Sequence, residues 1–147
     1  MRVVSQMAGA YDRGRETGTY MDQLDNSRSK TRKVLIADDN RELRSLLGEL
    51  LATFGHQVSC AENGQRALDM FLAPASQYDL VITDICMPVM SGIELIDHIR
   101  TYNREIRIIA ITGYADMGML DAVKHGCVEL FYKPLNIPAF AEYIESI

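Results

Sequence analysis

The sequence predicts an α/β fold in which a five-stranded parallel sheet lies between two layers of helices. Five short apolar runs alternate along the chain with five segments of helical periodicity, and such alternation indicates a parallel sheet covered on both faces. Each predicted strand is almost wholly apolar, as burial on both faces of the sheet requires. The chain has 147 residues, the length of one ordinary domain.

The strands are predicted from short apolar runs, several rich in β-branched residues, that stop at polar residues. The first run, residues 34–37, stops at Asp38, and the third, residues 80–83, stops at Asp84. The fourth run ends at Thr112 and Gly113. In chain order, strands are expected at residues 34–37, 57–61, 80–83, 106–111 and 128–132.

The helices are predicted from apolar residues that recur three and four positions apart. Asn40 fits the N-cap of the first helix and Gly55 its end. Asn63 and Gly64 open the second helix, and Pro74 ends it. Helices are therefore expected at residues 43–54, 64–72, 93–99, 117–125 and 138–146.

Residues 1–31 differ from the rest of the chain, because they are polar and show no sustained period. We expect a flexible leader there, with a short helix near residues 20–24 that packs on a partner or on the domain as the alternative. Residues 32–147 form the predicted folded domain.

Composition excludes several classes of protein. The 15 Lys and Arg against 20 Asp and Glu leave a formal charge of −5, which disfavours direct binding of nucleic acid. No run approaches the roughly 18 apolar residues of a membrane span. The start of the chain lacks a signal peptide's apolar core, and three cysteines far apart in sequence suit a reducing cytoplasm.

A surface role is expected for His56, His98 and His125.

Chemically active side chains follow the ends of several predicted strands. In an open parallel sheet, ligands bind beyond the carboxyl ends of the strands. Carboxylates crowded together at that edge repel one another unless a cation lies among them, and oxygen ligands suit Mg²⁺, which also accepts a phosphoryl oxygen. The residues expected at this edge are Asp38, Asp39, Asp84, Thr112 and Lys133.

A carboxylate can act as a nucleophile towards phosphorus and form an aspartyl phosphate. The phosphoryl oxygens then need positive charge, which Mg²⁺ and Lys133 would supply, and the Thr112 hydroxyl would add a hydrogen bond. Gly113 leaves the mouth of the site open beside Thr112. The sequence therefore predicts phosphoryl chemistry at a magnesium site.

From about Lys33 to the end, the sequence resembles the receiver domains of two-component response regulators. Four motifs at the ends of four strands carry the resemblance: Asp38-Asp39, the segment 84–88 (DICMP) with Gly92, Thr112-Gly113, and Lys133-Pro134. The resemblance implies a flavodoxin-like (βα)5 three-layer sandwich, whose parallel sheet has the strand order 2-1-3-4-5. Pro88, Gly92 and Pro134 are expected in structural roles, and the bond before Pro134 is expected to be cis.

The resemblance also implies a role for each site residue. Asp84 would accept the phosphoryl group from a sensor histidine kinase or a histidine phosphotransfer protein. Asp39 and Asp84 would bind Mg²⁺ directly, Asp38 through water, and the backbone carbonyl of Cys86 would complete the protein ligands. Lys133 and Thr112 would contact the phosphoryl group and shift the surface of the fourth helix, fifth strand and last helix towards a downstream protein target.

Three positions bear on how that family pattern applies here. Three residues before Lys133 the family usually has an aromatic residue that turns with the threonine, and this chain has Leu130. Alternation predicts that Phe131 faces the opposite side of the sheet. Cys86 and Tyr114 hold the positions that tune the lifetime of the phosphate in the family, and the Cys86 side chain is expected to be partly buried.

The sequence leaves other functions and assemblies as alternatives. A flavodoxin-like binding protein would need a Ser/Thr/Gly-rich phosphate loop after the first strand, where this chain has acidic residues. A haloacid-dehalogenase-type phosphatase spaces its first two aspartates two residues apart, whereas Asp38 and Asp39 are adjacent. Within the receiver interpretation, the chain is a signalling phosphoacceptor that is not an enzyme, or a fragment of a larger regulator or hybrid kinase. It would act as a monomer or a phosphorylation-linked dimer, without direct contact to nucleic acid or membrane.

Overall fold

The computed structural model describes residues 30–113, 117–126 and 129–147. The elements described below all belong to the compact unit Thr31–Ile147. The leader predicted for residues 1–31 lies almost wholly outside the described residues, as does Tyr114.

Five parallel strands form one sheet in the order β2-β1-β3-β4-β5, which confirms the predicted fold. β1 and β3 lie side by side because the connection from β2 to β3 passes over β1, whereas every other connection joins neighbouring strands. The strands are β1 (Lys33–Ala37), β2 (Gln57–Ala61), β3 (Leu80–Asp84), β4 (Arg107–Thr112) and β5 (Glu129–Tyr132).

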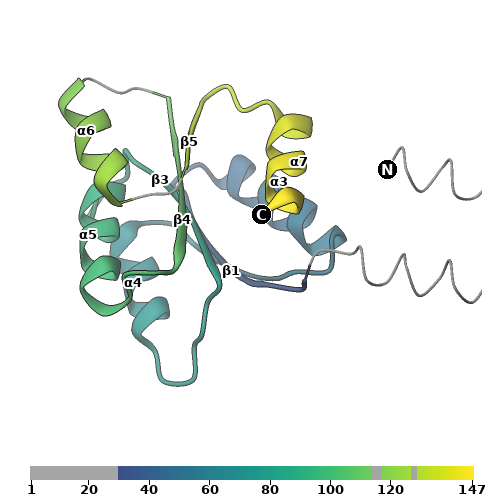
Figure 1. Ribbon diagram of the computed structural model, residues 1–147, viewed down its shortest axis with the longest axis horizontal. Coiled ribbons are helices and arrows are strands. Elements are labelled where there is room, and N and C mark those ends of the chain that lie inside the picture. The colour runs from purple at the N-terminus through teal and green to yellow at the C-terminus, as the bar shows by residue number, and fades with distance from the viewer. Residues whose placement is uncertain (1–29, 114–116, 127–128) are drawn as a thin grey trace, which may run out of the picture. The chain divides into compact units, whose positions relative to one another are not determined.

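In the part of the chain that the structure describes, five helices cover the sheet in two layers (Figure 1). They are α3 (Arg41–Thr53), α4 (Gly64–Leu72), α5 (Gly92–Tyr102), α6 (Met117–Gly126) and α7 (Ile137–Ser146). α3 and α7 lie on one face, and α4, α5 and α6 lie on the other. The N-caps of α3 and α4 are Asn40 and Asn63, as predicted, and each side chain accepts a hydrogen bond from the backbone N–H of the third residue of its helix.

Two apolar cores, one on each face, hold these layers to the sheet. Alternate residues of a strand point to opposite faces, so Leu35 joins the core under α4 and α5 while Ile36 joins the core under α3 and α7. Every residue of β3 is buried. The ends of the central strands are thereby fixed, and with them the residues that follow each strand.

Small differences from the predicted elements have local causes. β4 ends one residue later than predicted, because Thr112 still pairs with Tyr132 of β5, and it begins one residue later, at Arg107, which pairs with Leu80 of β3. Gly92 is the first residue of α5 rather than the residue before it, since Ser91 is the N-cap.

His56 is buried at 5% exposure, which corrects its predicted surface role. Its Nδ1 accepts a hydrogen bond from the backbone N–H of Arg32 at 3.1 Å, and its Nε2 lies 3.9 Å from a carboxylate oxygen of Glu145 in α7. The turn between α3 and β2 therefore places the imidazole beneath α7.

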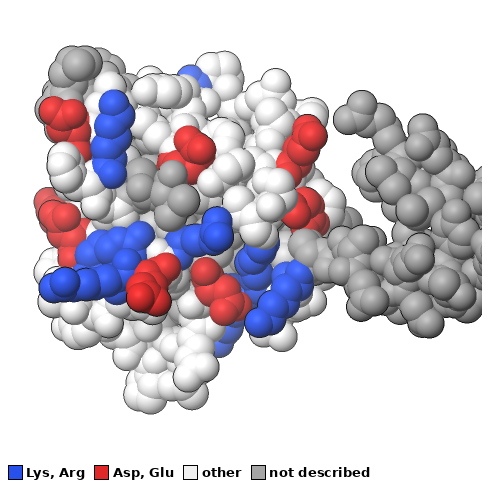
Figure 2. All heavy atoms as spheres, in the orientation of Figure 1, with Lys and Arg blue, Asp and Glu red and all other residues white. Residues whose placement is uncertain are grey.

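The surface carries both signs of charge. Figure 2 shows Lys and Arg side chains next to Asp and Glu side chains on the face viewed, so the described residues there form no uninterrupted basic area. Within the described part of the chain, every helix is too short or too polar to cross a membrane.

Candidate functional site

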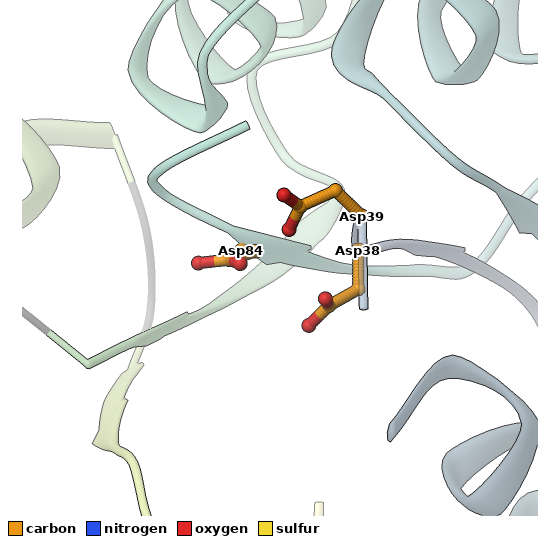
Figure 3. Close-up of side chains that lie close together, drawn as sticks. All are labelled: Asp38, Asp39 and Asp84. Atoms are coloured by element: carbon orange, nitrogen blue, oxygen red, sulfur yellow. The ribbon is translucent and has the colours of Figure 1, made fainter. Parts of the chain in front are cut away.

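Three carboxylates meet at the carboxyl edge of the sheet. Asp38 and Asp39 follow β1, and Asp84 is the last residue of the neighbouring strand β3. One carboxylate oxygen from each lies within 4.8 Å of the other two, and the three side chains gather at this edge in Figure 3. Asp38 and Asp84 are buried, whereas Asp39 is exposed. The sheet topology therefore brings together the acidic residues that the sequence placed at this edge.

Backbone contacts fix Asp38 in a buried position. Its Oδ1 accepts a hydrogen bond from the N–H of Asn40 at 2.7 Å. Its backbone carbonyl accepts a hydrogen bond from the guanidinium of Arg44 at 2.6 Å. The other carboxylate oxygen, Oδ2, is buried and accepts no hydrogen bond from the described residues. A buried carboxylate oxygen without a hydrogen bond has capacity to bind a cation.

Lys133 places a positive charge beside two of these carboxylates. Its Nζ donates a hydrogen bond to Asp84 Oδ2 at 3.0 Å and lies 3.4 Å from Asp38 Oδ2. The other Asp84 oxygen accepts a longer hydrogen bond, 3.3 Å, from the backbone N–H of Cys86. The ammonium therefore bridges the carboxylates of two neighbouring strands.

Burial and charge oppose each other at this site. Burial raises the pKa of Asp84, and the nearby Asp38 carboxylate raises it further, against the opposing effect of Lys133. Burial lowers the pKa of Lys133, but its hydrogen bond to Asp84 and the negative charges of Asp38 and Asp84 outweigh that effect, so its pKa lies above the ordinary value. Each ionised group is thus stabilised by its partners and destabilised by loss of water.

The donor set fits a hard divalent cation. Three carboxylates and one ammonium leave a formal charge of −2 at the site, and one buried carboxylate oxygen has no hydrogen bond. Mg²⁺ prefers one or two carboxylates together with water and phosphoryl oxygens. Asp38, Asp39 and Asp84 therefore fit the predicted magnesium site.

Thr112 and Gly113 lie next to Lys133 at the same edge. Thr112 is the last residue of β4 and is 1% exposed, and its carbonyl accepts a hydrogen bond from the Lys133 N–H at 2.8 Å. A Cβ built on Gly113 would lie 3.6 Å from the Lys133 side chain, which is ordinary contact. The Lys133–Pro134 peptide bond is cis, as expected.

The loop after β3 packs closely against Asp84. A Cβ on Gly92 would overlap the backbone carbonyl oxygen of Asp84 and would lie 2.8 Å from Ile85 Cα. Gly92 is therefore required where α5 begins, and its N–H donates to the Ile85 carbonyl at 2.8 Å. Pro88 lies exposed within the same loop.

The side chain of Cys86 is exposed, which corrects the expectation of partial burial. Its neighbour Ile85 takes the buried position, at 1% exposure, so the following side chain points to solvent. The backbone N–H of Cys86 contacts Asp84 as described, which places this residue at the edge of the site.

Leu130 and Phe131 lie on opposite faces of β5, as alternation predicts. Leu130 pairs with Ala110 of β4 and packs against the core under α4 and α5. Phe131 packs against Phe140 and Tyr143 of α7 with ring-centroid distances of 5.0 and 5.3 Å. The aromatic contacts of this strand are therefore made with α7.

Sequence reasoning missed two contributors to the site. The N–H of Asn40, predicted only as an N-cap, also positions Asp38. Arg44 holds the Asp38 carbonyl from one turn into α3. An arginine in a helix's first turns gives no pattern that separates this role from an exposed one.

Comparison with known proteins identifies the family. Residues 34–145 match the model of the response regulator receiver domain. Over 115 residues the chain is 33% identical to sporulation initiation phosphotransferase F of Bacillus subtilis, covering 78% of this chain and 91% of that protein. Over 108 residues it is 37% identical to a response regulator receiver protein of Anaeromyxobacter sp., covering 73% of this chain but only 44% of that longer protein.

Solved structures show the same architecture. The response regulator TrrA of Thermotoga maritima, in complex with Mg²⁺ and BeF, is 34% identical and has a TM-score of 0.70, over 79% of this chain and 98% of that one. This chain has the same kind of sheet, gathers three carboxylates at one edge of it and matches the family model. The chain therefore belongs to the family of response regulator receiver domains.

Proposed function

We propose that this receiver domain accepts a phosphoryl group on Asp84 from a sensor histidine kinase or a histidine phosphotransfer protein. The observation that carries the assignment is the position of Asp84. Asp84 is 4% exposed, and its carboxylate lies near two further carboxylates and accepts a hydrogen bond from Lys133. Family membership favours this role over a flavin carrier or a haloacid-dehalogenase-type phosphatase.

The proposed reaction is a simple displacement at phosphorus. An Asp84 oxygen attacks the phosphorus of a donor phosphohistidine, and an O–P bond forms as the P–N bond breaks. The imidazole nitrogen keeps the electron pair of the broken bond. Positioning and electrostatic stabilisation supply most of the catalysis of such transfers.

Two side chains would stabilise the transferred group. Lys133 already contacts Asp84 and would move its hydrogen bond to a phosphoryl oxygen. Thr112, buried at the end of β4, would donate its hydroxyl hydrogen to another. Mg²⁺ bound by Asp39 and Asp84, by Asp38 through water and by the Cys86 carbonyl would neutralise further charge. The Mg²⁺–BeF complex of the TrrA relative supports this metal.

The output surface would consist of α6, β5 and α7. Phe131 of β5 packs edge-on against Phe140 and Tyr143 of α7, so a movement at the end of β4 and β5 is coupled to that helix. A downstream protein would read this surface, and the chain would act in the cytoplasm as a monomer or a phosphorylation-linked dimer. It would catalyse only its own phosphorylation and dephosphorylation.

The assignment of Asp84 is tested with acetyl phosphate and Mg²⁺. We expect one hydroxylamine-sensitive phosphoryl adduct by intact mass, and none in Asp84→Asn. Asp97→Asn is the matched control, because Asp97 is exposed on α5 and lies outside the acidic cluster. Equal labelling of Asp84→Asn and the wild type would show that another residue is the acceptor.

A further inference from the structure

β2 is an edge strand of the sheet. In the described part of the chain it pairs only with β1, and it comes first in the strand order. The Gln57 N–H and the Ala61 carbonyl both form hydrogen bonds on the β1 side of the strand. Because backbone groups alternate in direction along a strand, the N–H and C=O groups of Val58 and Cys60 point away from β1. They point to the open side of the sheet.

The open side of β2 lacks the features that usually prevent strands from pairing. Natural sheet edges are blocked by charged residues, prolines or bulges. The strand Gln57–Ala61 (QVSCA) contains no charged residue and no proline, and all its residues keep register with β1. The opposite edge differs, because β5 begins at Glu129 and is followed directly by Lys133. β2 is thus the edge to which another strand can be added.

A hollow of about 380 Å³ lies beside this edge, between α3 and β2. Gly48 and Ala52 of α3 and Val58 and Cys60 of β2 are among the residues that line it. A Cβ built on Gly48 would lie 3.5 Å from Cys60 Sγ and 3.9 Å from a Val58 methyl group, so the middle of α3 is level with the middle of the strand. Cys60 is exposed. The small side chains of α3 therefore leave room for a second molecule to approach the strand.

A second copy of this chain fits the open edge. Antiparallel pairing about a two-fold axis at Ser59 places Val58 opposite Cys60 of the second copy, and Cys60 opposite the Val58 of that copy. The outward N–H and C=O groups of these residues then bond to one another reciprocally. An uncharged strand can face its own copy without bringing like charges together, and a two-fold axis closes the assembly.

Charges on α3 also match those of a second copy. Arg44 and Glu49 line the same hollow, and they lie on opposite sides of Gly48 along the helix. A two-fold axis beside Gly48 reverses the direction of α3 in the second copy, which brings its Glu49 towards Arg44. The Arg44 guanidinium is held in place by the Asp38 carbonyl. Exposed pairs of this kind set orientation and contribute little affinity.

We propose that two copies of this chain associate through antiparallel pairing of their β2 strands, which joins their two sheets into one. The contact lies at the opposite edge of the sheet from β5, so it does not use the surface of α6, β5 and α7. It depends neither on phosphorylation nor on the proposed role of Asp84. A short strand gives a small interface, so the association is weak and increases with protein concentration.

Cysteine crosslinking tests the register. In a chain whose natural cysteines (Cys60, Cys86 and Cys127) are replaced by serine, Ser59→Cys places a thiol at the two-fold axis. The two Cα atoms at such a position lie about 4.5 Å apart, within reach of a disulfide. Gln57→Cys is the matched control on the same face of the same strand, because the two copies of residue 57 would lie about 14 Å apart along the strand. Under copper phenanthroline, Ser59→Cys should form a covalent dimer at least about tenfold faster than Gln57→Cys.

Charge substitutions test the same contact without a covalent bond. The two copies of residue 60 lie diagonally across the strand pair, so Cys60→Lys and Cys60→Glu each bring like charges together. Each variant alone should raise the dissociation constant, measured by sedimentation velocity, by about fivefold or more. An equimolar mixture of the two should restore association, which excludes a folding defect. Thr101→Lys, at an exposed position on α5, should keep the wild-type value.

Some results would overturn the proposal. A wild-type chain that is a monomer at every concentration would do so. If the Val58 and Cys60 amides of that monomer were protected from hydrogen exchange, another segment of the same chain would cover the edge. Free exchange of these amides would leave the edge to a different protein. Faster crosslinking of Gln57→Cys than of Ser59→Cys would reject the register, and dimers insensitive to charge at Cys60 would place the contact elsewhere.

Discussion

Lys133 and Asp84 are 49 positions apart in the chain, yet Lys133 Nζ lies 3.0 Å from Asp84 Oδ2. The same ammonium lies 3.4 Å from Asp38. Three strands that are separate in sequence thus deliver one cation and two buried carboxylates to one point. The consequences of this arrangement can be tested one group at a time.

Lys133→Ala separates binding of the metal from binding of the phosphoryl group. The lysine neutralises the carboxylates without donating an oxygen ligand, so we expect Mg²⁺ affinity to be unchanged or tighter, by isothermal titration. The rise in melting temperature given by Mg²⁺ with beryllofluoride should be mostly lost, because that ligand mimics the phosphoryl group. Lys124→Ala, on the exposed surface of α6, is the control. Loss of Mg²⁺ binding in Lys133→Ala would contradict the role given to the lysine.

Asp39→Asn removes one of three crowded charges. Asp39 is exposed and belongs to the cluster with Asp38 and Asp84, so its loss relieves repulsion when no metal is bound. We expect unfolding without Mg²⁺ to require about 0.5–1 kcal/mol more free energy, together with at least about tenfold weaker Mg²⁺ binding. Urea titrations with and without Mg²⁺ measure both.

The control for that change is Glu49→Gln, since Glu49 is an exposed acid on α3 outside the cluster. Glu49→Gln should change neither the free energy of unfolding without Mg²⁺ nor the affinity for Mg²⁺. A destabilised Asp39→Asn protein in metal-free buffer would mean that repulsion among these carboxylates is negligible.

Gly92→Ala tests the close packing of the loop on Asp84. The new methyl group would overlap the Asp84 carbonyl oxygen, and both partners are backbone, so we expect a loss of about 2–3 kcal/mol in the free energy of unfolding. Gly48→Ala is the matched comparison within a helix. Its methyl group would lie 3.5 Å from Cys60 Sγ, and it should stabilise α3 by up to about 1 kcal/mol. Similar effects of the two substitutions in urea unfolding would argue against this packing.

His56 should make stability depend on pH. Burial lowers the pKa of His56, opposed by Glu145 and assisted by Arg32, so the folded state favours the neutral ring. A proton on Nδ1 would also displace the hydrogen bond from the Arg32 N–H. The unfolded chain then binds more protons below pH 6.5, the ordinary value of this group. The contribution of His56 to the free energy of unfolding is therefore complete above that pH and is lost as the pH falls below it.

The measurement is the urea midpoint between pH 8 and pH 5.5. His56→Asn keeps an acceptor for Arg32 but does not titrate, so its midpoint should fall less steeply than that of the wild type. His98→Asn, at an exposed position on α5, should retain the wild-type slope. Parallel curves for His56→Asn and the wild type would assign the pH dependence to other groups.

The periodicity of apolar residues was sufficient to predict the order and approximate bounds of the elements. Buried strands such as β3 must be apolar on both faces, and helix ends need caps such as Asn40 and Asn63. These features are therefore encoded by residues close together in the sequence. The acidic edge followed from the same reasoning, because the carboxyl ends of parallel strands share one edge.

Long-range packing decided the remaining features, which no local pattern encodes. The burial of His56 depends on α7, which lies nearly ninety positions later in the chain, and on the N–H of Arg32. Val89 has a φ of +69°, in a loop where Gly64 and Gly92 allow close packing against Met90 and Asp84. The sequence by itself determined which side chains reach the edge of the sheet. Only the tertiary structure decided which of them are buried, paired or left exposed, since burial depends on contacts between segments that are distant in the chain.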